Sequence, residues 1–190
     1  TTASGTSAGT EQSDSAAAPA PTPEATGIGR HATVTSGKYE GMTADQIAAS
    51  LTLEQKADQM VQPAIYNTSN TMMGTHDYGS ILSTWDGTFV KETPEDWYDR
   101  ICKIQSNALA SSAAIPFVYG QDSVHGVNYS LNTVIFPHNI NIGMAGDADL
   151  AYQMGTAVAE EILPTGMLWN FSPCVASAQD PRWGRTYESY

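Results

Sequence analysis

The sequence is poor in basic residues and lacks long apolar runs. Lys and Arg number 8 against 20 Asp and Glu, which gives a formal net charge of −12. Because polyanions repel such a chain, nucleic acid and anionic membrane surfaces are poor partners. No window approaches the roughly 18 consecutive apolar residues of a membrane-spanning helix, and the N-terminus lacks the charged and apolar regions of a signal peptide. We therefore expect no membrane span.

Cysteine and the common cofactor motifs are also scarce. The two cysteines, Cys102 and Cys174, are too few for a disulfide framework or a structural zinc site. We favour free buried thiols over a single bridge, because unpaired cysteine is commonly buried. The sequence contains no GxGxxG, P-loop, GxSxG or HExxH pattern. The absence of these motifs argues against redox, nucleotide and metal chemistry, and we expect no cofactor.

Branched apolar residues and Phe are few, and their distribution divides the chain. Leu, Ile, Val and Phe make up 32 of the 190 residues, and residues 1–40 contribute only two of them. In the stretch 1–27, 23 residues are Ser, Thr, Ala, Gly or Pro. Such a composition cannot bury enough apolar area to offset the entropy lost on ordering. We predict a disordered Ser/Thr/Ala/Pro-rich linker at 1–41 and a globular segment at 42–190.

Helix-start signals recur along the globular segment. The capping-box patterns Thr43–Gln46 and Thr52–Gln55 predict a helical region from about 44 to 60. A second helix is predicted from about 94 to 111 and a third from about 148 to 163, each with apolar residues at helical spacing. The expected N-caps are Thr93 for the second helix and Asp147 or Asp149 for the third.

Short runs with strand character alternate with these helices. Strands that alternate with helices indicate a parallel sheet in an α/β fold. In such a fold, ligands bind beyond the carboxyl ends of the strands, which here means the long loops 120–146 and 176–190. The expected strands are Met60–Ile65, Gly79–Leu82, Ile115–Tyr119 and Met167–Val175.

Asp122 is the first candidate binding residue. It follows the predicted strand Ile115–Tyr119, and we infer that Gly120 lets the backbone turn so that the carboxylate projects toward a ligand. The alternative is that Asp122 caps a turn through its own backbone. For nearby His125 we favour a satisfied core histidine over a catalyst, because nothing adjacent marks it as a base.

Arg185 is the second candidate. The segment 180–190 combines two arginines with tyrosines and a tryptophan, which suits a polyol, because hydroxyls bind charged donors and sugar faces pack on aromatic rings. Asp180 and Arg182 are expected to pair with each other and hold the loop. Arg185 has no carboxylate before it as an obvious partner, and Gly184 beside it permits close approach. We therefore predict that Arg185 faces the ligand.

A series of motifs in this order resembles the N-terminal barrel domain of glycoside hydrolase family 3. The resemblance covers about residues 42–190 and is greatest to β-glucan exohydrolases and related β-glucosidases of plants and bacteria. The motifs that carry it are Leu51–Lys56, Gln59–Met60, Gly79–Leu82, Ile115–Pro116, Asp122–Gly126, Ile135–Asn139, Gly155–Glu161, Phe171–Cys174 and Asp180–Tyr190.

The resemblance implies a role for two residues. In the family, the Asp of the Asp-x-Val-His-Gly motif accepts hydrogen bonds from hydroxyls of the glucose at the cleavage site. The Arg that ends the Asp-Pro-Arg-Trp-Gly-Arg motif donates to the same sugar. These positions are Asp122 and Arg185 in this sequence. The family's Lys-His pair, its Asp nucleophile and its Glu acid/base would lie beyond Tyr190, so no catalytic residue is expected within this chain.

The resemblance also implies a fold and an activity. The expected fold is α/β, the N-terminal half of a (β/α)8 TIM-like barrel preceded by a disordered tail, because a full barrel needs about 250 residues. We expect the parent protein to be an exo-acting, retaining β-glucosidase or exo-1,3/1,4-β-glucanase, with a β-glucan or β-glucoside oligosaccharide as its partner. The 190-residue piece alone is expected to be inactive and largely molten or aggregated.

Three alternatives stay open at this point. The first is a β-xylosidase or N-acetylhexosaminidase of the same family, and the second is a non-catalytic carbohydrate-binding protein. The third is a structural surface protein displayed on its tail. The start at Thr1 instead of Met favours an export signal that was removed, so the expected location is secreted, periplasmic or at the cell surface. The sequence gives no indication of the oligomeric state.

Overall fold

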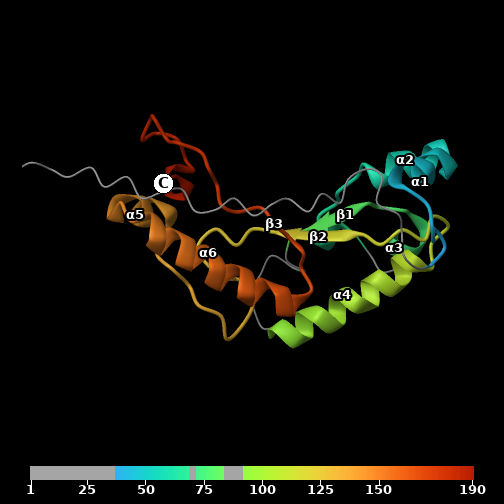
Figure 1. Cartoon of the computed structure of the whole chain (residues 1–190), viewed down its shortest axis with the longest axis horizontal. Coiled ribbons are helices and arrows are strands. Elements are labelled where there is room, and N and C mark those ends of the chain that lie inside the picture. Colours follow the sequence, from blue (N-terminus) through green and yellow to red (C-terminus); the bar gives the residue numbers. More distant parts are fainter. Residues whose placement is uncertain (1–36, 69–71, 84–91) are drawn as a thin grey trace, which may run out of the picture.

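The computed structural model of the chain describes residues 37–68, 72–83 and 92–190. Within these residues, three short strands form one parallel sheet in the order β1-β2-β3 (Figure 1). In the register of the sheet, Ser80 lies opposite Val118 and Gly120 lies opposite Trp169. The predicted α/β class with a parallel sheet is confirmed. The strands are β1 (Ser80–Leu82), β2 (Val118–Gln121) and β3 (Trp169–Asn170).

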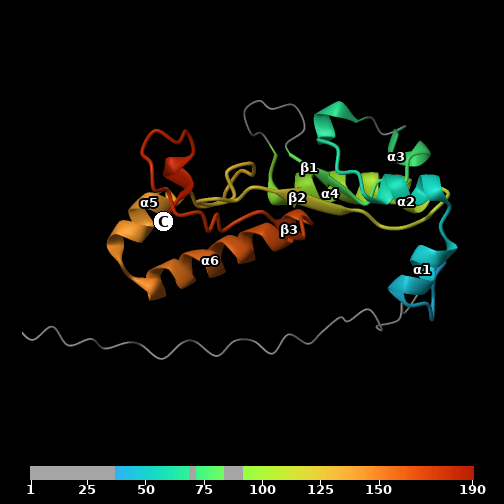
Figure 2. The ribbon, with the colours of Figure 1, turned by 90° about the horizontal axis from the view of Figure 1, so that it is seen from above.

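Helices lead from each strand to the next. Helix α4 connects β1 to β2, and α5 and α6 connect β2 to β3. Helices α4 and α6 lie along the same side of the sheet (Figure 1), and α5 lies beside the C-terminal segment at one end (Figure 2). The α-helices are α1 (Ala44–Ser50), α2 (Leu53–Gln59), α3 (Met72–Thr75), α4 (Pro94–Leu109), α5 (Asn139–Ala145) and α6 (Ala148–Ile162). Three 3-10 helices are η1 (Ile65–Asn67), η2 (Leu163–Thr165) and η3 (Thr186–Glu188).

The helix starts follow local signals. Thr43, Thr52 and Thr93 each form a capping box, in which the Thr hydroxyl accepts from the third helical N–H and that residue's side chain accepts from the Thr N–H. Leu51 has an extended conformation between α1 and α2, so the helical region expected at 44–60 is two helices. Of the two candidate caps of α6, Asp147 accepts the hydrogen bond from Leu150.

Three of the four expected strands differ from the structure. In the run Met60–Ile65, the first residue closes α2 and the last begins η1, while an isolated bridge joins Ala64 to Leu82. Pro63 has no N–H to donate to a ladder, which prevents a continuous strand. The run expected at 115–119 is displaced to β2 at Val118–Gln121.

The run expected at 167–175 pairs at two residues, Trp169 and Asn170. The amide of Ser172 donates to the Asn170 side chain instead of to a strand, and Pro173, after a cis peptide bond, has no N–H. Helix α5 was not expected either. Its N-cap residue, His138, makes no side-chain capping hydrogen bond, so the usual sequence signal for a helix start is missing.

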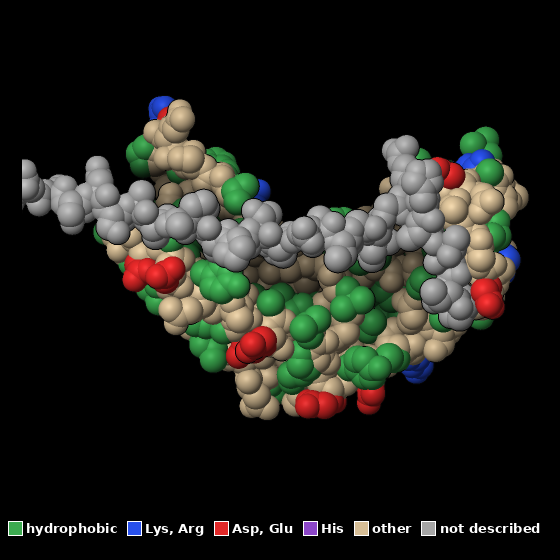
Figure 3. Space-filling view, in the orientation of Figure 1, with side chains coloured by type: hydrophobic (Ala, Val, Ile, Leu, Met, Phe, Trp, Pro, Cys, Tyr) green, Lys and Arg blue, Asp and Glu red, His purple; other side chains and the backbone are tan. Residues whose placement is uncertain are grey.

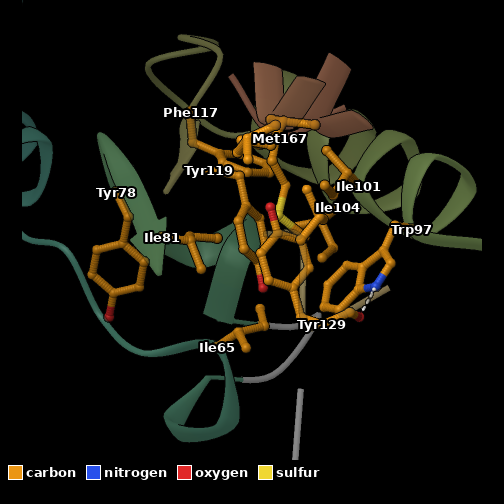
Figure 4. Packing of buried hydrophobic residues seen from close by; sticks show 14 residues of the cluster. Ile65, Tyr78, Ile81, Trp97, Ile101, Ile104, Phe117, Tyr119, Tyr129 and Met167 are labelled. Atoms are coloured by element: carbon orange, nitrogen blue, oxygen red, sulfur yellow. Dashed lines mark hydrogen bonds between the residues drawn. The ribbon is translucent and has the colours of Figure 1, made fainter. Parts of the chain in front are cut away.

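The apolar core lies between the sheet and α4 (Figure 4). Trp97 on α4 is 1% exposed, packs edge-on against Tyr119 of β2 and Tyr129, and donates its indole N–H to the Tyr129 carbonyl oxygen at 2.8 Å. Tyr129 belongs to the loop that follows β2, so the core fixes this loop as well as the sheet. The α4 residues expected at helical spacing, Trp97, Ile101, Ile104 and Ala108, are all buried.

A polar network at the amino ends of the strands centres on Asp77. Its buried carboxylate accepts hydrogen bonds from the hydroxyls of Ser111 and Ser112 and from the Ala113 amide. Burial raises the pKa of Asp77, but these hydrogen bonds outweigh it and hold the pKa below the usual value. Tyr39, buried, donates its hydroxyl to the Ala113 carbonyl. Packing therefore begins before residue 42, and the rest of the predicted linker, 1–36, lies outside the described residues.

Several large apolar side chains remain exposed around β3 and the ends of α6. Leu163, Leu168 and Val175 are 63%, 76% and 86% exposed. Figure 3 shows hydrophobic side chains interspersed with acidic ones on the face that carries α4 and α6. Both cysteines are free thiols, as expected, but Cys102 is exposed and Cys174 is half-buried. None of the described helices is long and apolar enough to span a membrane.

Candidate functional site

Asp122 lies directly beyond the carboxyl end of β2. The backbone on both sides of it is fixed by the end of β3, because the Phe171 amide donates to the Gln121 carbonyl oxygen at 3.1 Å and the Ser123 amide donates to the Asn170 side chain at 3.2 Å. Within the described residues the Asp122 carboxylate makes no hydrogen bond. The turn-capping alternative is therefore not what the structure shows, and the carboxylate is open to a ligand.

Gly120 has a different role from the one predicted. It lies within β2 and not at a turn. A Cβ atom at this position would stand 2.4 Å from the Phe171 ring, closer than any real contact, so Gly120 leaves the space in which that ring packs. The ring in turn holds the segment that follows β3 against the start of the Asp122 loop.

The loop after β2 is fastened at several points. The Ser123 hydroxyl donates to the Tyr129 hydroxyl at 3.1 Å, which links the residue after Asp122 to the core. Gly126 has a φ of +128°, and a Cβ there would stand 2.3 Å from the Val134 carbonyl oxygen. This position therefore requires glycine. Asp122 accordingly projects from a rigid loop.

The C-terminal segment forms the second wall of the site. It packs on α5, where the fully buried Asn139 donates its side-chain N–H to the Glu188 carbonyl oxygen at 2.8 Å. This contact, together with helix η3, brings Arg185 and Glu188 toward the end of β2 although 63 positions separate Asp122 from Arg185. Figure 2 shows the segment folded back beside α5.

Asp122 and Arg185, the two predicted binding residues, line the same cavity. It has a volume of about 230 Å³, and one guanidinium and two carboxylates line it. Such a cavity offers both hydrogen-bond acceptors and donors, as a polyhydroxylated ligand requires. Sequence reasoning did not single out Glu188, Tyr187, Asn128 or Val124. The lining residues are Asp122, Val124, His125, Asn128, Arg185, Tyr187 and Glu188.

Glu188 is the partner of Arg185 that sequence reasoning missed. The Arg185 Nε and Nη2 atoms donate to the two Glu188 carboxylate oxygens at 2.8 and 2.6 Å. The sequence prediction took account only of carboxylates that precede Arg185. Glu188 follows Arg185 by three residues, a spacing at which side chains on one helical turn meet. A Cβ at Gly184 would meet nothing within 4 Å, so packing among the described residues does not require glycine there.

The charged groups that line the cavity shift one another's pKa values. Hydrogen bonds from Arg185 lower the pKa of Glu188 to about 2, and the same contact raises the pKa of Arg185. Burial and the negative charge of Glu188 raise the pKa of Asp122, an effect that Arg185 partly offsets. Burial and Glu188 also raise the pKa of the Cys174 thiol, which donates to Glu188 at 3.3 Å.

His125 is held by the backbone but is not a core residue. One ring nitrogen lies 3.0 Å from the Phe136 carbonyl oxygen, the ring is half-buried, and it lines the cavity. The rings of His125 and His138 lie 4.2 Å apart, and His138 meets Tyr187 edge-on at 5.3 Å. The contacts among these three rings join the loop after β2 to the C-terminal segment.

The predicted ion pair of Asp180 with Arg182 is confirmed. Arg182 donates to both Asp180 carboxylate oxygens, with Nε at 2.9 and 3.1 Å, and both residues are exposed and lie outside the lining of the cavity. Among the described residues, no group of three or more His, Cys, Asp or Glu side chains is arranged to hold a metal ion.

A larger cavity, of about 430 Å³, lies between α6 and the segment after β3. Its wall is formed mainly by apolar residues such as Met154, Val158 and Val175 and contains no Asp, Glu, Lys, Arg or His. Of these two cavities, the smaller one, lined by Asp122 and Arg185, is therefore the one with charged side chains.

The sequence model of the glycosyl hydrolase family 3 N terminal domain matches residues 52–190. The lysosomal beta glucosidase of Dictyostelium discoideum is 33% identical over 95 residues, which are 50% of this chain and 12% of that protein. The periplasmic beta-glucosidase of Salmonella typhimurium is 29% identical over 91 residues, which are 47% of this chain and 11% of that protein.

A solved structure adds the fold. The crystal structure of the exo-1,3/1,4-beta-glucanase from a Pseudoalteromonas species superposes with a TM-score of 0.70 at 37% identity, covering 77% of this chain and 19% of that one. The chain therefore spans a small part of each of these proteins. The family match takes in β1, β2, β3 and the whole cavity of Asp122 and Arg185, and this chain belongs to glycosyl hydrolase family 3 through the N terminal domain of that family.

Proposed function

We propose that this chain is the sugar-binding part of an exo-acting, retaining β-glucosidase or exo-1,3/1,4-β-glucanase. The observation that carries the proposal is the convergence of Asp122 and Arg185 on one cavity beyond the carboxyl end of β2. The names of the relatives, two beta-glucosidases and an exo-1,3/1,4-beta-glucanase, support a β-glucoside as the substrate class.

The two residues act by binding the terminal sugar. The Asp122 carboxylate accepts from sugar hydroxyls and Arg185 donates to sugar oxygens, and both are charge-assisted hydrogen bonds. A sugar that is held at its hydroxyls can change shape at the ring carbon that reacts. Bonds that strengthen as the ring flattens toward an oxocarbenium ion lower the barrier to cleavage.

The nucleophile and the acid/base lie outside residues 1–190 in this proposal. A retaining mechanism needs two carboxyl groups about 5–5.5 Å apart, one of which forms a covalent glycosyl-enzyme that water then hydrolyses. Within the cavity, Glu188 is held by Arg185, and Asp122 is assigned to sugar hydroxyls. A fluorinated glucoside should therefore label the full-length protein at a carboxylate beyond Tyr190, and a label within residues 1–190 would overturn the assignment.

The activity is tested on the full-length protein with three chromogenic substrates. We expect p-nitrophenol release to be fastest from the β-glucoside. Preference for the β-xyloside or the N-acetyl-β-glucosaminide would assign a different activity of the same family. Binding of a β-glucan without hydrolysis of any substrate would assign a carbohydrate-binding protein, and neither binding nor hydrolysis would favour a structural surface protein.

The described fold corresponds, in this proposal, to the first part of a (β/α)8 barrel whose sheet continues beyond β3. Support comes from the exposed apolar side chains of Leu168, Trp169 and Val175 at and around that strand, which an added layer would cover. Residues 1–190 alone should accordingly lack both glucoside hydrolysis and a cooperative thermal transition. A cooperative melt with hydrolysis by this segment would contradict the proposal.

The proposed location is secreted, periplasmic or at the cell surface. The Ser/Thr/Ala/Pro-rich composition of residues 1–27 supports it, because tethers of this kind hold domains away from surfaces. The name of one relative, which refers to the periplasm, also supports it. Fractionation of the producing cell, with assay of each fraction, tests the location.

A further inference from the structure

The cavity contains one cation and two anions that compete for it. Arg185 and Asp122 face the same space, so an ion pair between them would satisfy both groups and block both from a ligand. Among the described residues, the ion pair of Arg185 is with Glu188 and not with Asp122. Arg185 therefore pairs with Glu188, and the Asp122 carboxylate has no ion pair among the described residues.

The position of the pair is set by Glu188 and not by Arg185. The Glu188 side chain is 8% exposed, whereas the Arg185 side chain is 63% exposed. The backbone of Glu188 is tied to α5 through the Asn139 side chain, and its carboxylate also accepts from Cys174. A buried carboxylate fixed from two sides can hold a long, exposed side chain at a defined place.

The paired guanidinium keeps donors for a ligand. Arg has five N–H groups in a planar fork, and Glu188 takes the edge formed by Nε and Nη2. The remaining donors are the two of Nη1 and the second of Nη2. The second N–H of Nη2 and one N–H of Nη1 form another edge, which can donate to two neighbouring hydroxyl oxygens of a sugar.

We propose that Glu188 is a positioning residue that holds the Arg185 guanidinium away from Asp122, so that both groups stay open to the same sugar. This inference rests on the proposed function, because it assigns Glu188 a role in sugar binding at that site. Without the Glu188 charge, Arg185 pairs with Asp122, and a sugar must break that pair before it can bind.

The test is a double-mutant cycle in the full-length protein. The variants are Glu188→Gln, Arg185→Ala and their combination, with kcat/KM for p-nitrophenyl β-glucoside and the inhibition constant of glucose as readouts. We expect Glu188→Gln to lower kcat/KM by about 10- to 100-fold, since a displacement of about 1 Å can cost 10²-fold. Glucose inhibition should weaken in parallel.

The combination decides between positioning and other roles. If Glu188 acts through Arg185, adding Glu188→Gln to Arg185→Ala should change kcat/KM by less than about threefold, because the two residues form one unit. Multiplication of the two single effects would mean that Glu188 acts independently and would overturn the inference. So would a Glu188→Gln variant within about threefold of the wild type.

Asp180→Asn is the matched control. It removes an Arg-paired carboxylate from the same segment, outside the cavity lining. We expect kcat/KM to stay within about twofold of the wild type, as for other exposed pairs. A loss as large as that of Glu188→Gln would mean that any ion pair of this segment matters, and would overturn a specific role of Glu188.

Arg185→Lys keeps the inference testable if Glu188→Gln does not fold. This variant leaves a cation beside the buried Glu188 carboxylate, but an ammonium cannot form the two-point pair. We expect activity within about threefold of Arg185→Ala, and activity near the wild type would overturn the inference. Unchanged kinetics in both Arg185→Ala and Asp122→Asn would instead overturn the proposed function, and this inference with it.

Discussion

The backbone of Tyr190 lies directly against Gly143 of α5. A Cβ atom at position 143 would stand 2.6 Å from the Tyr190 carbonyl carbon and 3.0 Å from its Cα. Because the obstacle is backbone and not the end of a flexible side chain, any larger residue at 143 must displace the C-terminal segment. That segment carries Arg185 and Glu188. A methyl group added at position 143 would therefore displace two residues that line the cavity, although Gly143 itself does not line it.

Gly143→Ala is therefore expected to lower both stability and sugar binding. Forced overpacking costs about 1–3 kcal/mol of the free energy of unfolding, and displacement of the segment should weaken glucose inhibition of the full-length protein. Gly155→Ala on α6 is the control, because a Cβ there meets nothing within 4 Å. It should raise the free energy of unfolding by about 0.5–1 kcal/mol. Equal thermal midpoints for the two variants would contradict the close approach.

Gly120→Ala tests the packing of Phe171. The added methyl group meets the ring at 2.4 Å, so the ring must leave its place over β2. We expect a loss of about 1–3 kcal/mol in the free energy of unfolding, measured by thermal denaturation of the full-length protein. The control is Gly184→Ala, since position 184 is open, and it should leave the midpoint unchanged.

Asp122→Asn is expected to lower kcat/KM by about 10²-fold or more. Each hydrogen bond to a charged group is worth about 1.5–3 kcal/mol, and two such bonds to sugar hydroxyls would lose their ionic component. The thermal midpoint should not fall, because the Asp122 carboxylate makes no hydrogen bond within the described residues. Unchanged kinetics would remove the residue from the sugar site.

Acid should release the C-terminal segment by protonating Glu188. Its pKa in the fold is about 2, below the value of about 4.3 for an unfolded chain. A lowered pKa contributes stability that is complete above about pH 4.3 and is lost as the pH falls toward 2. Trp183 fluorescence of the full-length protein should report this loss, and the Glu188→Gln variant should not show that component.

Glucose binding should weaken at a higher pH than an ordinary aspartate would dictate. Burial and Glu188 raise the pKa of Asp122, so this carboxylate takes up a proton earlier during acidification and then ceases to be a pure acceptor. In Glu188→Gln the raising charge is gone, and the acid limb of glucose inhibition should move to lower pH. A limb at the same pH in both proteins would argue against Asp122 as its source.

Features with short-range causes were predictable from the sequence. The capping boxes at Thr43, Thr52 and Thr93 depend on residues three positions apart, and all three form. The Asp180–Arg182 pair is equally local. The parallel sheet followed from the alternation of strands and helices, and Asp122 lies beyond the carboxyl end of β2 as that alternation predicted.

Features that depend on tertiary contacts were not predictable in the same way. Helix α5 has no side-chain cap at His138 and is held by packing against η3. The space at Gly120 is defined by Phe171, which is 51 positions away. Glu188 was missed because its position depends on hydrogen bonds from Asn139 and Cys174 as much as on its spacing to Arg185.

The network around Asp77 lies at the amino ends of the strands, at the opposite edge of the sheet from Asp122. One carboxylate there clamps the turn before β2 to the turn before β1, through contacts that involve no residue of the cavity. The Asp77 network and the cavity of Asp122 and Arg185 therefore lie at opposite ends of the same strands. A change in the loops at the carboxyl ends of the strands would therefore leave the Asp77 network intact, because none of its hydrogen bonds involves those loops.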